Sequence, residues 1–103
     1  MRDVFEYTMN NYENDISLET IANVSNMTKN AFCKYFKKRT NKTFIHFLNE
    51  LRIEHACKKL ISEKDVSVTE IAELVGFNNM SNFNRQFKSL KFVSPSEFRK
   101  NNQ

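Results

Sequence analysis

One glycine and one proline in 103 residues strongly favour a helical fold for this chain. Tight hairpin turns and phosphate-cradling loops both require glycine at fixed positions, so neither is supported. Ten phenylalanines and an apolar fraction of 40% supply enough hydrophobic material for a compact core without a metal or a disulfide. The chain is too short for a doubly wound or barrel enzyme. We therefore expect an all-α fold of about seven helices.

An internal repeat organises these expected helices. A shift of 50 residues aligns two short apolar segments, and a shift of 51 then aligns two basic segments in which phenylalanines recur at i and i+4. Each copy therefore has a short helix with an Ile-Ala pair, a tight turn and a basic helix, which is the plan of a helix-turn-helix. The main aligned pairs are Leu18 with Val68, Ile21 with Ile71, Ala22 with Ala72, Phe32 with Phe83, Lys34 with Arg85, Phe36 with Phe87, Lys37 with Lys88 and Thr43 with Ser94.

A longer helix separates the two copies. Its apolar positions form two sets that are offset by nine residues, which at about 100° per residue places them on opposite sides of the helix. We predict one domain over residues 1–103, with a first subdomain at about 3–42, a linker helix at about 43–61 and a second subdomain at about 66–101. The two sets are Phe44, Phe47, Leu48 and Leu51, and Ile53, Ala56, Cys57 and Leu60.

Capping residues predict where the helices begin and end. A side-chain oxygen at the N-cap accepts a backbone N–H of the first turn, and a Glu three residues later completes a capping box. Gly76 is expected at a C-cap, where a left-handed residue ends a helix. Tyr35 and Leu74 are expected on the packed faces of their helices. The predicted N-caps are Asp3 (with Glu6), Ser17, Thr28, Thr43, Ser67 (with Glu70), Asn79, and Ser94 (with Pro95 and Glu97).

The basic residues are concentrated in two windows. Residues 28–42 contain six basic side chains and residues 78–92 contain three, and neither window contains an acid. The rest of the chain is acidic, although the net charge of the whole is +4. Two separated basic blocks indicate a polyanion bound at two places, and the alternative is two solvated helix faces.

The second helix of each copy would pack its aromatic residues inward and present polar residues outward. In the first copy the outward set is Lys29, Asn30, Cys33, Lys34, Lys37 and Lys38; in the second it is Ser81, Asn82, Asn84, Arg85 and Lys88. Asn can pair with adenine and Arg or Lys with guanine, whereas a Lys near a helix end more often contacts phosphate.

Other chemistry has little support in the sequence. Cys33 and Cys57 form no C-x-x-C pair, so neither a disulfide framework nor a zinc site is indicated, and a reducing cytoplasm fits best. His46 and His55 lie nine positions apart on opposite helix faces, which excludes joint metal ligation within that helix. No nucleophile, base and orienting group occur together, and no leader or membrane-spanning run is present. We expect no enzyme activity, no cofactor and no metal.

The same residues carry a family resemblance. The second half resembles the signature of the AraC/XylS family of bacterial transcription regulators, and the first half resembles that family's first helix-turn-helix and linker helix. The second-half residues are Ile71-Ala72, Val75-Gly76-Phe77, Asn82-Phe83, Arg85, Phe87-Lys88 and Ser94-Pro95-Ser96-Glu97-Phe98-Arg99. Those of the first half include Leu18, Ile21-Ala22, Met27-Thr28, Phe36-Lys37-Lys38, Thr40, Phe47, Leu51-Arg52-Ile53-Glu54, Ala56 and Leu60.

The resemblance implies a seven-helix domain whose two recognition helices enter successive major-groove segments of double-stranded promoter DNA, commonly with activation through RNA polymerase. Many members carry a separate effector or dimerisation domain, so the chain is either a minimal regulator or a C-terminal piece. Base contacts are implied for Asn30, Cys33, Lys34, Met80, Ser81, Asn82, Asn84 and Arg85. Backbone contacts are expected for Thr28, Lys29, Lys37, Lys38, Thr43, Lys88 and Ser94.

Two positions depart from the family pattern. Asn41 and Phe92 stand where the family usually has Gly, just after each recognition helix. Because Asn tolerates the left-handed conformation and Phe does so poorly, the turn at Phe92 is expected to differ from the turn that the family forms with Gly. The thiol of Cys33 is a weak hydrogen-bonding group, so the first helix is expected to read fewer bases than the second. The alternative function is a helical protein-interaction module, which would bind DNA without steep salt dependence.

Overall fold

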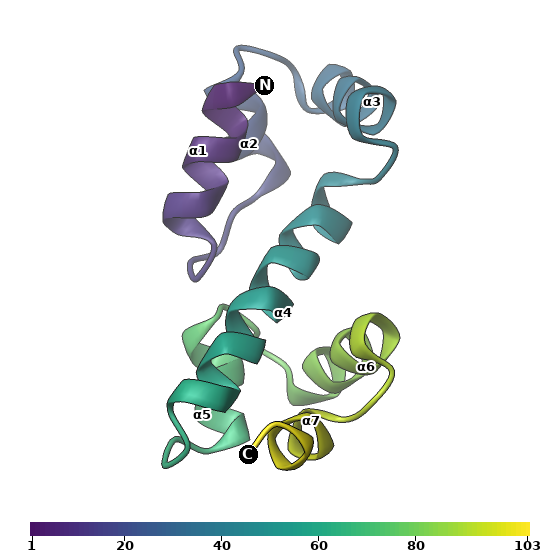
Figure 1. Cartoon of the computed structure of the whole chain (residues 1–103). Helices are drawn as coiled ribbons and strands as arrows, with labels where there is room; N and C mark the ends of the chain where they lie inside the picture. Colours follow the sequence, from purple (N-terminus) through teal and green to yellow (C-terminus); the bar gives the residue numbers. More distant parts are fainter. The chain divides into compact units, whose positions relative to one another are not determined.

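The computed structural model describes all 103 residues and contains seven α-helices and no strand, which confirms the all-α prediction (Figure 1). The chain forms two compact units, Met1–Leu48 and Asn49–Gln103, called here the first unit and the second unit. The helices are α1 (Arg2–Asn11), α2 (Leu18–Val24), α3 (Lys29–Thr40), α4 (Phe44–Ser62), α5 (Val68–Leu74), α6 (Met80–Lys91) and α7 (Pro95–Asn101).

The core of the first unit is built around Phe36, which has no exposed surface. Its ring lies 5.7 Å from that of Phe32 and 5.6 Å from that of Phe44, measured between centroids. Phe5 of α1 and Phe47 of α4 also lie against it, at 6.3 and 5.7 Å. Edge and tilted contacts of this kind favour a close-packed aromatic core. Helix α3 is therefore held by phenylalanines from α1 and from the start of α4.

The second unit repeats this arrangement with fewer rings. Phe87 of α6 is fully buried between Phe83, at 5.8 Å, and Phe98 of α7, at 5.5 Å. Phe83 also contacts Phe77, with the centroids 5.2 Å apart. The guanidinium of Arg52, which is only 9% exposed, lies over the Phe77 ring at 5.9 Å, a favourable cation–π geometry.

Both apolar stripes predicted for the long helix are buried, apart from Phe47 and Leu51, which are half-buried. Helix α4 begins in the first unit and ends in the second. Phe44 and Leu48 belong to the first core, with Phe47 packed against it. The buried residues of the second stripe are Ile53, Ala56, Cys57 and Leu60.

Six of the seven predicted N-caps are confirmed. In each case the side-chain oxygen accepts the backbone N–H three residues later, at 2.9 to 3.2 Å, which satisfies one of the free donors of a helix start. Pro95 occupies the first turn of α7, where its missing N–H is tolerated. The six confirmed caps are Ser17, Thr28, Thr43, Ser67, Asn79 and Ser94.

Three local predictions are wrong. Helix α1 begins at Arg2 with Met1 as its N-cap and no side-chain cap, so Asp3 lies inside the first turn instead of capping it. The C-cap of α5 is Val75, and Gly76, with φ 107°, follows one residue later. Leu74 is 50% exposed because it lies to one side of the buried face formed by Ile71, Ala72 and Val75.

The repeat extends to the backbone turns. Met27 N donates to Ala22 O at 3.0 Å in the first copy, and Phe77 N donates to Ala72 O at 2.9 Å in the second. The turn residues with positive φ also correspond, since Asn26 has φ 56° where the second copy has Gly76. Both copies therefore use the same left-handed turn between their two helices.

The turn at Phe92 has the same left-handed conformation as its counterpart at Asn41. Asn41 has φ 62° and Phe92 has φ 69°, and each donates its N–H to the carbonyl four residues earlier at 2.8 Å. A left-handed Phe costs about 1 to 2 kcal/mol. The helix-ending hydrogen bond and the Ser94 cap two residues later hold this conformation, while the Phe92 side chain is 83% exposed.

Candidate nucleic-acid interface

Each unit presents a helix-turn-helix whose second helix has a buried aromatic face and a polar outer face. In α3 the buried residues are Phe32 and Phe36, and in α6 they are Phe83 and Phe87. Because residues four apart lie on one side of a helix, burying these pairs places the residue midway between them, Lys34 or Arg85, on the opposite and exposed side. Figure 1 shows α3 following α2 and α6 following α5 after a short turn in each unit.

The outer face of α3 is strongly basic. Five of its twelve residues are basic, none is acidic, and all five basic side chains are exposed. Asn30 is exposed as well, and Thr28 is exposed at the N-cap. The guanidinium of Arg39 lies 5.8 Å from the ring centroid of Tyr35, which is half-buried instead of packed in the core. The basic residues of α3 are Lys29, Lys34, Lys37, Lys38 and Arg39.

Cys33 occupies a different environment from the other predicted contact residues of α3. It is half-buried and packs against the core of the first unit. With Leu18, Thr43, Phe44 and Ile45 it lines a mainly apolar cavity of about 360 Å³. The thiol therefore lies at the edge of the packed face. The sequence pattern predicts it on the outer face, so that prediction is only partly met.

A shallow hollow lined by polar and basic residues lies where α3 ends and α4 begins. Lys37, Asn41, Lys42, Thr43 and His46 line it, and its volume is about 410 Å³. Thr43 Oγ1 accepts the His46 N–H at 3.1 Å at the start of α4. A helix N-terminus carries partial positive charge, so two of the predicted backbone-contact residues, Lys37 and Thr43, lie together in a cationic setting.

The outer face of α6 carries more amides and fewer charges than that of α3. Ser81, Asn84, Arg85 and Lys88 are exposed, whereas Met80 and Asn82 are half-buried. Arg85 Nη2 donates to Asn82 Oδ1 at 2.8 Å, so one amide of this face is already engaged with the guanidinium. The i, i+3 spacing of these two residues is a sequence signal that could have predicted the contact.

Lys91 contributes less free positive charge to the basic window at residues 78–92 than its position in the sequence indicates. Its ammonium forms an ion pair and hydrogen bond with the Glu54 carboxylate of α4. The hydrogen bond to Glu54 raises the pKa of Lys91 above its ordinary value, against the smaller effect of burial. This pair joins residues 37 positions apart in the sequence, so local sequence patterns carry no signal for it.

The structure has few features of a metal site, a reactive cysteine site or a membrane span. No group of three or more His, Cys, Asp or Glu side chains is arranged to hold a metal. Both cysteines are free, and burial raises the pKa of the Cys57 thiol to about 11. None of the helices combines the length and hydropathy that a membrane span requires.

Comparisons with known proteins identify the class. A family model described as a helix-turn-helix domain matches residues 21–101. An uncharacterized HTH-type transcriptional regulator in the cgkA 5' region of Pseudoalteromonas carrageenovora is 40% identical over 94 residues, covering 91% of this chain and 55% of that protein. Among solved structures, a probable AraC family transcriptional regulator from Rhodopseudomonas palustris is 24% identical with a TM-score of 0.90, covering 99% of this chain and 95% of that one. The DNA-binding domain of AdpA, a global transcriptional factor solved in complex with a target DNA, is 23% identical with a TM-score of 0.89, covering 97% and 89%.

The chain therefore belongs to the helix-turn-helix domain family, in its AraC type, as the sequence resemblance indicates. The matches assign it to the class of DNA-binding transcription regulators. It spans about half the length of the curated relative from Pseudoalteromonas carrageenovora.

Proposed function

We propose that this domain reads two major-groove segments of promoter DNA, with α3 and α6 as the recognition helices. The observation that carries the proposal is the repeated pairing, in each unit, of a buried Phe-Phe face with an acid-free outer face on the second helix. A helix of this kind fits the major groove, where each base pair presents a distinct pattern of donors and acceptors.

The proposed base-reading groups come from the N-terminal half of each helix. Lys34 and Arg85 are exposed at equivalent positions and are suited to the O6 and N7 acceptors of guanine. Asn30 and Asn84 are suited to adenine, and Ser81 to several base edges. Met80, Asn82 and Cys33 are proposed as base contacts on the family resemblance, although each is half-buried in the free protein.

The proposed backbone contacts surround these groups. Lys37 and Lys88 are exposed and lie one turn beyond the proposed readers Lys34 and Arg85, while Lys29 and Lys38 add charge to the first helix. Thr28, Thr43 and Ser94 cap helices, and the N-terminus of a helix offers N–H groups to phosphate. The first helix would therefore contribute more to phosphate neutralisation and the second more to base reading.

The regulatory outcome is proposed from the family resemblance alone. We infer activation of transcription through contact with RNA polymerase, in a cytoplasmic protein that is either a minimal regulator or one with a separate effector or dimerisation domain. A promoter-reporter assay with the full regulator tests this part, since activation raises reporter output when the binding site is intact. Output that falls when the regulator is supplied would instead assign repression.

The experiment that tests DNA reading compares three substitutions on a selected duplex and on a random duplex, each titrated at several salt concentrations. Arg85→Ala should lose about 1 to 3 kcal/mol on the selected duplex and less on the random one. Lys37→Ala should weaken both evenly and reduce the salt slope by about one. Lys64→Ala, which removes an exposed charge between α4 and α5, is the matched control and should change neither.

Two outcomes would overturn the proposal. Equal losses on both duplexes for Arg85→Ala would contradict base reading by α6. Weak binding by the unmodified protein that does not depend on salt would favour the protein-interaction module.

A further inference from the structure

The internal repeat continues past the recognition helices into the helix that follows each of them. Thr43 caps α4 and Ser94 caps α7 through equivalent hydrogen bonds of 3.1 and 3.2 Å. Each following helix then places a phenylalanine on the recognition helix. Phe47 lies 5.7 Å from Phe36 in the first unit, and Phe98 lies 5.5 Å from Phe87 in the second, between ring centroids.

Helices α4 and α7, which follow α3 and α6 and support them through a phenylalanine, differ in length and in the contacts that hold them. Helix α4 has 19 residues, whereas α7 has only seven. A seven-residue helix is unstable by itself and depends on tertiary contacts. The residue after the supporting phenylalanine is Leu48 in the first unit, 3% exposed in the core, and Arg99 in the second. An arginine therefore stands where its counterpart is a buried apolar residue.

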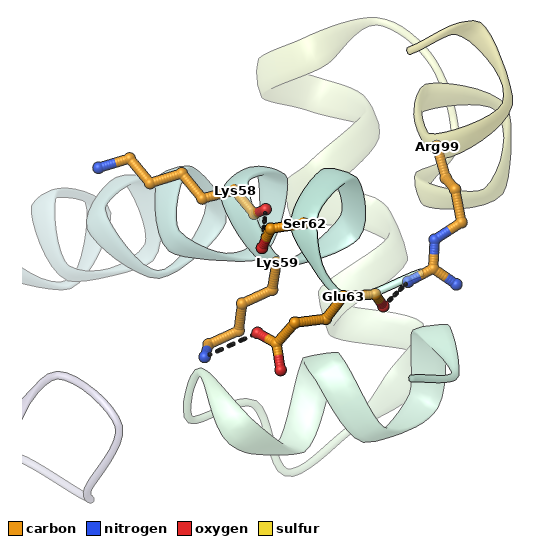
Figure 2. A network of polar contacts seen from close by, with 5 residues as sticks. All are labelled: Lys58, Lys59, Ser62, Glu63 and Arg99. Carbon is orange, nitrogen blue, oxygen red and sulfur yellow. Dashed lines mark hydrogen bonds and ion pairs between the residues drawn. The ribbon is translucent and has the colours of Figure 1, made fainter. Parts of the chain in front are cut away.

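Arg99 contacts the end of α4 within the second unit. Its Nε donates to the Leu60 carbonyl at 3.0 Å, and its Nη2 donates to the Glu63 carbonyl at 3.1 Å. Figure 2 shows Arg99 reaching this turn, where the Lys59 ammonium pairs with the Glu63 carboxylate at 3.3 Å. The last carbonyls of a helix lack partners within it and carry the negative end of its dipole, so a cation with several donors suits this position.

We infer that Arg99 is a positioning residue for sequence reading by α6. Its guanidinium fastens α7 to the end of α4, and the Phe98–Phe87 contact transmits that restraint to the recognition helix. The inference rests on the proposed function, because it concerns how α6 meets DNA. Since the guanidinium is directed at protein carbonyls, its loss removes no phosphate contact of Arg99 itself, and its main effect should be on the reading of bases by α6.

The DNA test compares Arg99→Ala and Arg99→Lys with Lys100→Ala, which removes an exposed charge from the adjacent residue. Arg99→Ala should lower affinity for the selected duplex about tenfold, with less than about a twofold change on a random duplex and an unchanged salt slope. The altered base preference should be confined to the segment of the site that α6 reads, which is the segment that contains the positions relaxed by Arg85→Ala. Arg99→Lys should recover part of the loss, because an ammonium can still donate to a carbonyl but lacks the planar fork.

A second arm measures amide hydrogen exchange without DNA. In Arg99→Ala the amides of α7 and α6 should exchange faster, while those of α3 should not change. If the unmodified protein selects no DNA site, the proposed function is refuted. The exchange measurement still gives a result in that case, and it alone then decides whether Arg99 anchors α7. Where Arg99→Ala does not fold, the same comparison is made with Arg99→Lys.

Two results would overturn the inference. If Arg99→Ala lowers the salt dependence of binding and weakens affinity equally for the selected and the random duplex, Arg99 contacts phosphate directly. Exchange rates and affinities that match those of Lys100→Ala would mean that Arg99 does not position α6.

Discussion

Replacing Phe87 by alanine should cost the second unit most of its stability. The side chain is fully buried, with the Phe83 ring at 5.8 Å and the Phe98 ring at 5.5 Å. A buried Phe removes about 150–250 Å² from water. At about 25 cal/mol per Å², the buried residue is worth roughly 4 to 6 kcal/mol of transfer free energy. Alanine retains part of that buried area, so truncation loses roughly 3 kcal/mol. The cavity left between the two neighbouring rings adds to this, so we expect a total loss of about 3 to 5 kcal/mol.

Urea denaturation followed by far-ultraviolet circular dichroism measures this loss as a lower midpoint at similar slope. Phe92→Ala is the matched control, because it removes the same side chain where 83% of it is exposed. That control should change the free energy of unfolding by less than about 0.5 kcal/mol. A loss below about 1 kcal/mol for Phe87→Ala, or equal losses for the two variants, would refute the assignment of Phe87 to the core.

Three further predictions follow from single contacts. In the native protein at pH 8, Cys57 should resist alkylation while the half-buried Cys33 reacts, because burial raises the pKa of Cys57 to about 11; mass spectrometry that finds equal labelling would contradict this. Glu54→Gln should cost a few tenths of a kcal/mol at pH 8. Because Glu54 raises the pKa of Lys91 in the folded state, that difference should vanish as the pH rises through the raised value, and a pH-independent difference in urea titrations would argue against the pair. Thr28→Ala should cost about 1 kcal/mol through loss of the α3 cap, and an unchanged unfolding midpoint would show that the cap is not stabilising.

Local sequence signals were sufficient for most of the fold. A cap such as Ser94 and its acceptor N–H lie three residues apart, so the pattern is visible in the sequence and the structure confirms it. The same holds for Phe83 and Phe87, whose spacing fixes which face of α6 is buried. The start of α1 could not be predicted from a capping pattern, because Met1 takes the N-cap position without a side-chain hydrogen bond.

Contacts between residues far apart in the sequence could not be predicted from local sequence signals. Arg99 finds its carbonyls 36 and 39 residues earlier in the chain, and Lys91 finds Glu54 37 residues earlier. Such pairs depend on how helices pack, which periodicity does not specify. The left-handed Phe92 is a separate case, since the helix-ending hydrogen bond to Lys88 accompanies a conformation that Phe intrinsically disfavours.

Selection of binding sites from a randomised double-stranded DNA pool, followed by salt titration of the best duplex, tests the central claim most directly. The account predicts a bipartite, non-palindromic site with two boxes about one helical turn apart and an affinity that falls steeply with salt. A single enriched box would mean that only one recognition helix reads bases. No enrichment, with weak binding that is insensitive to salt, would contradict the account.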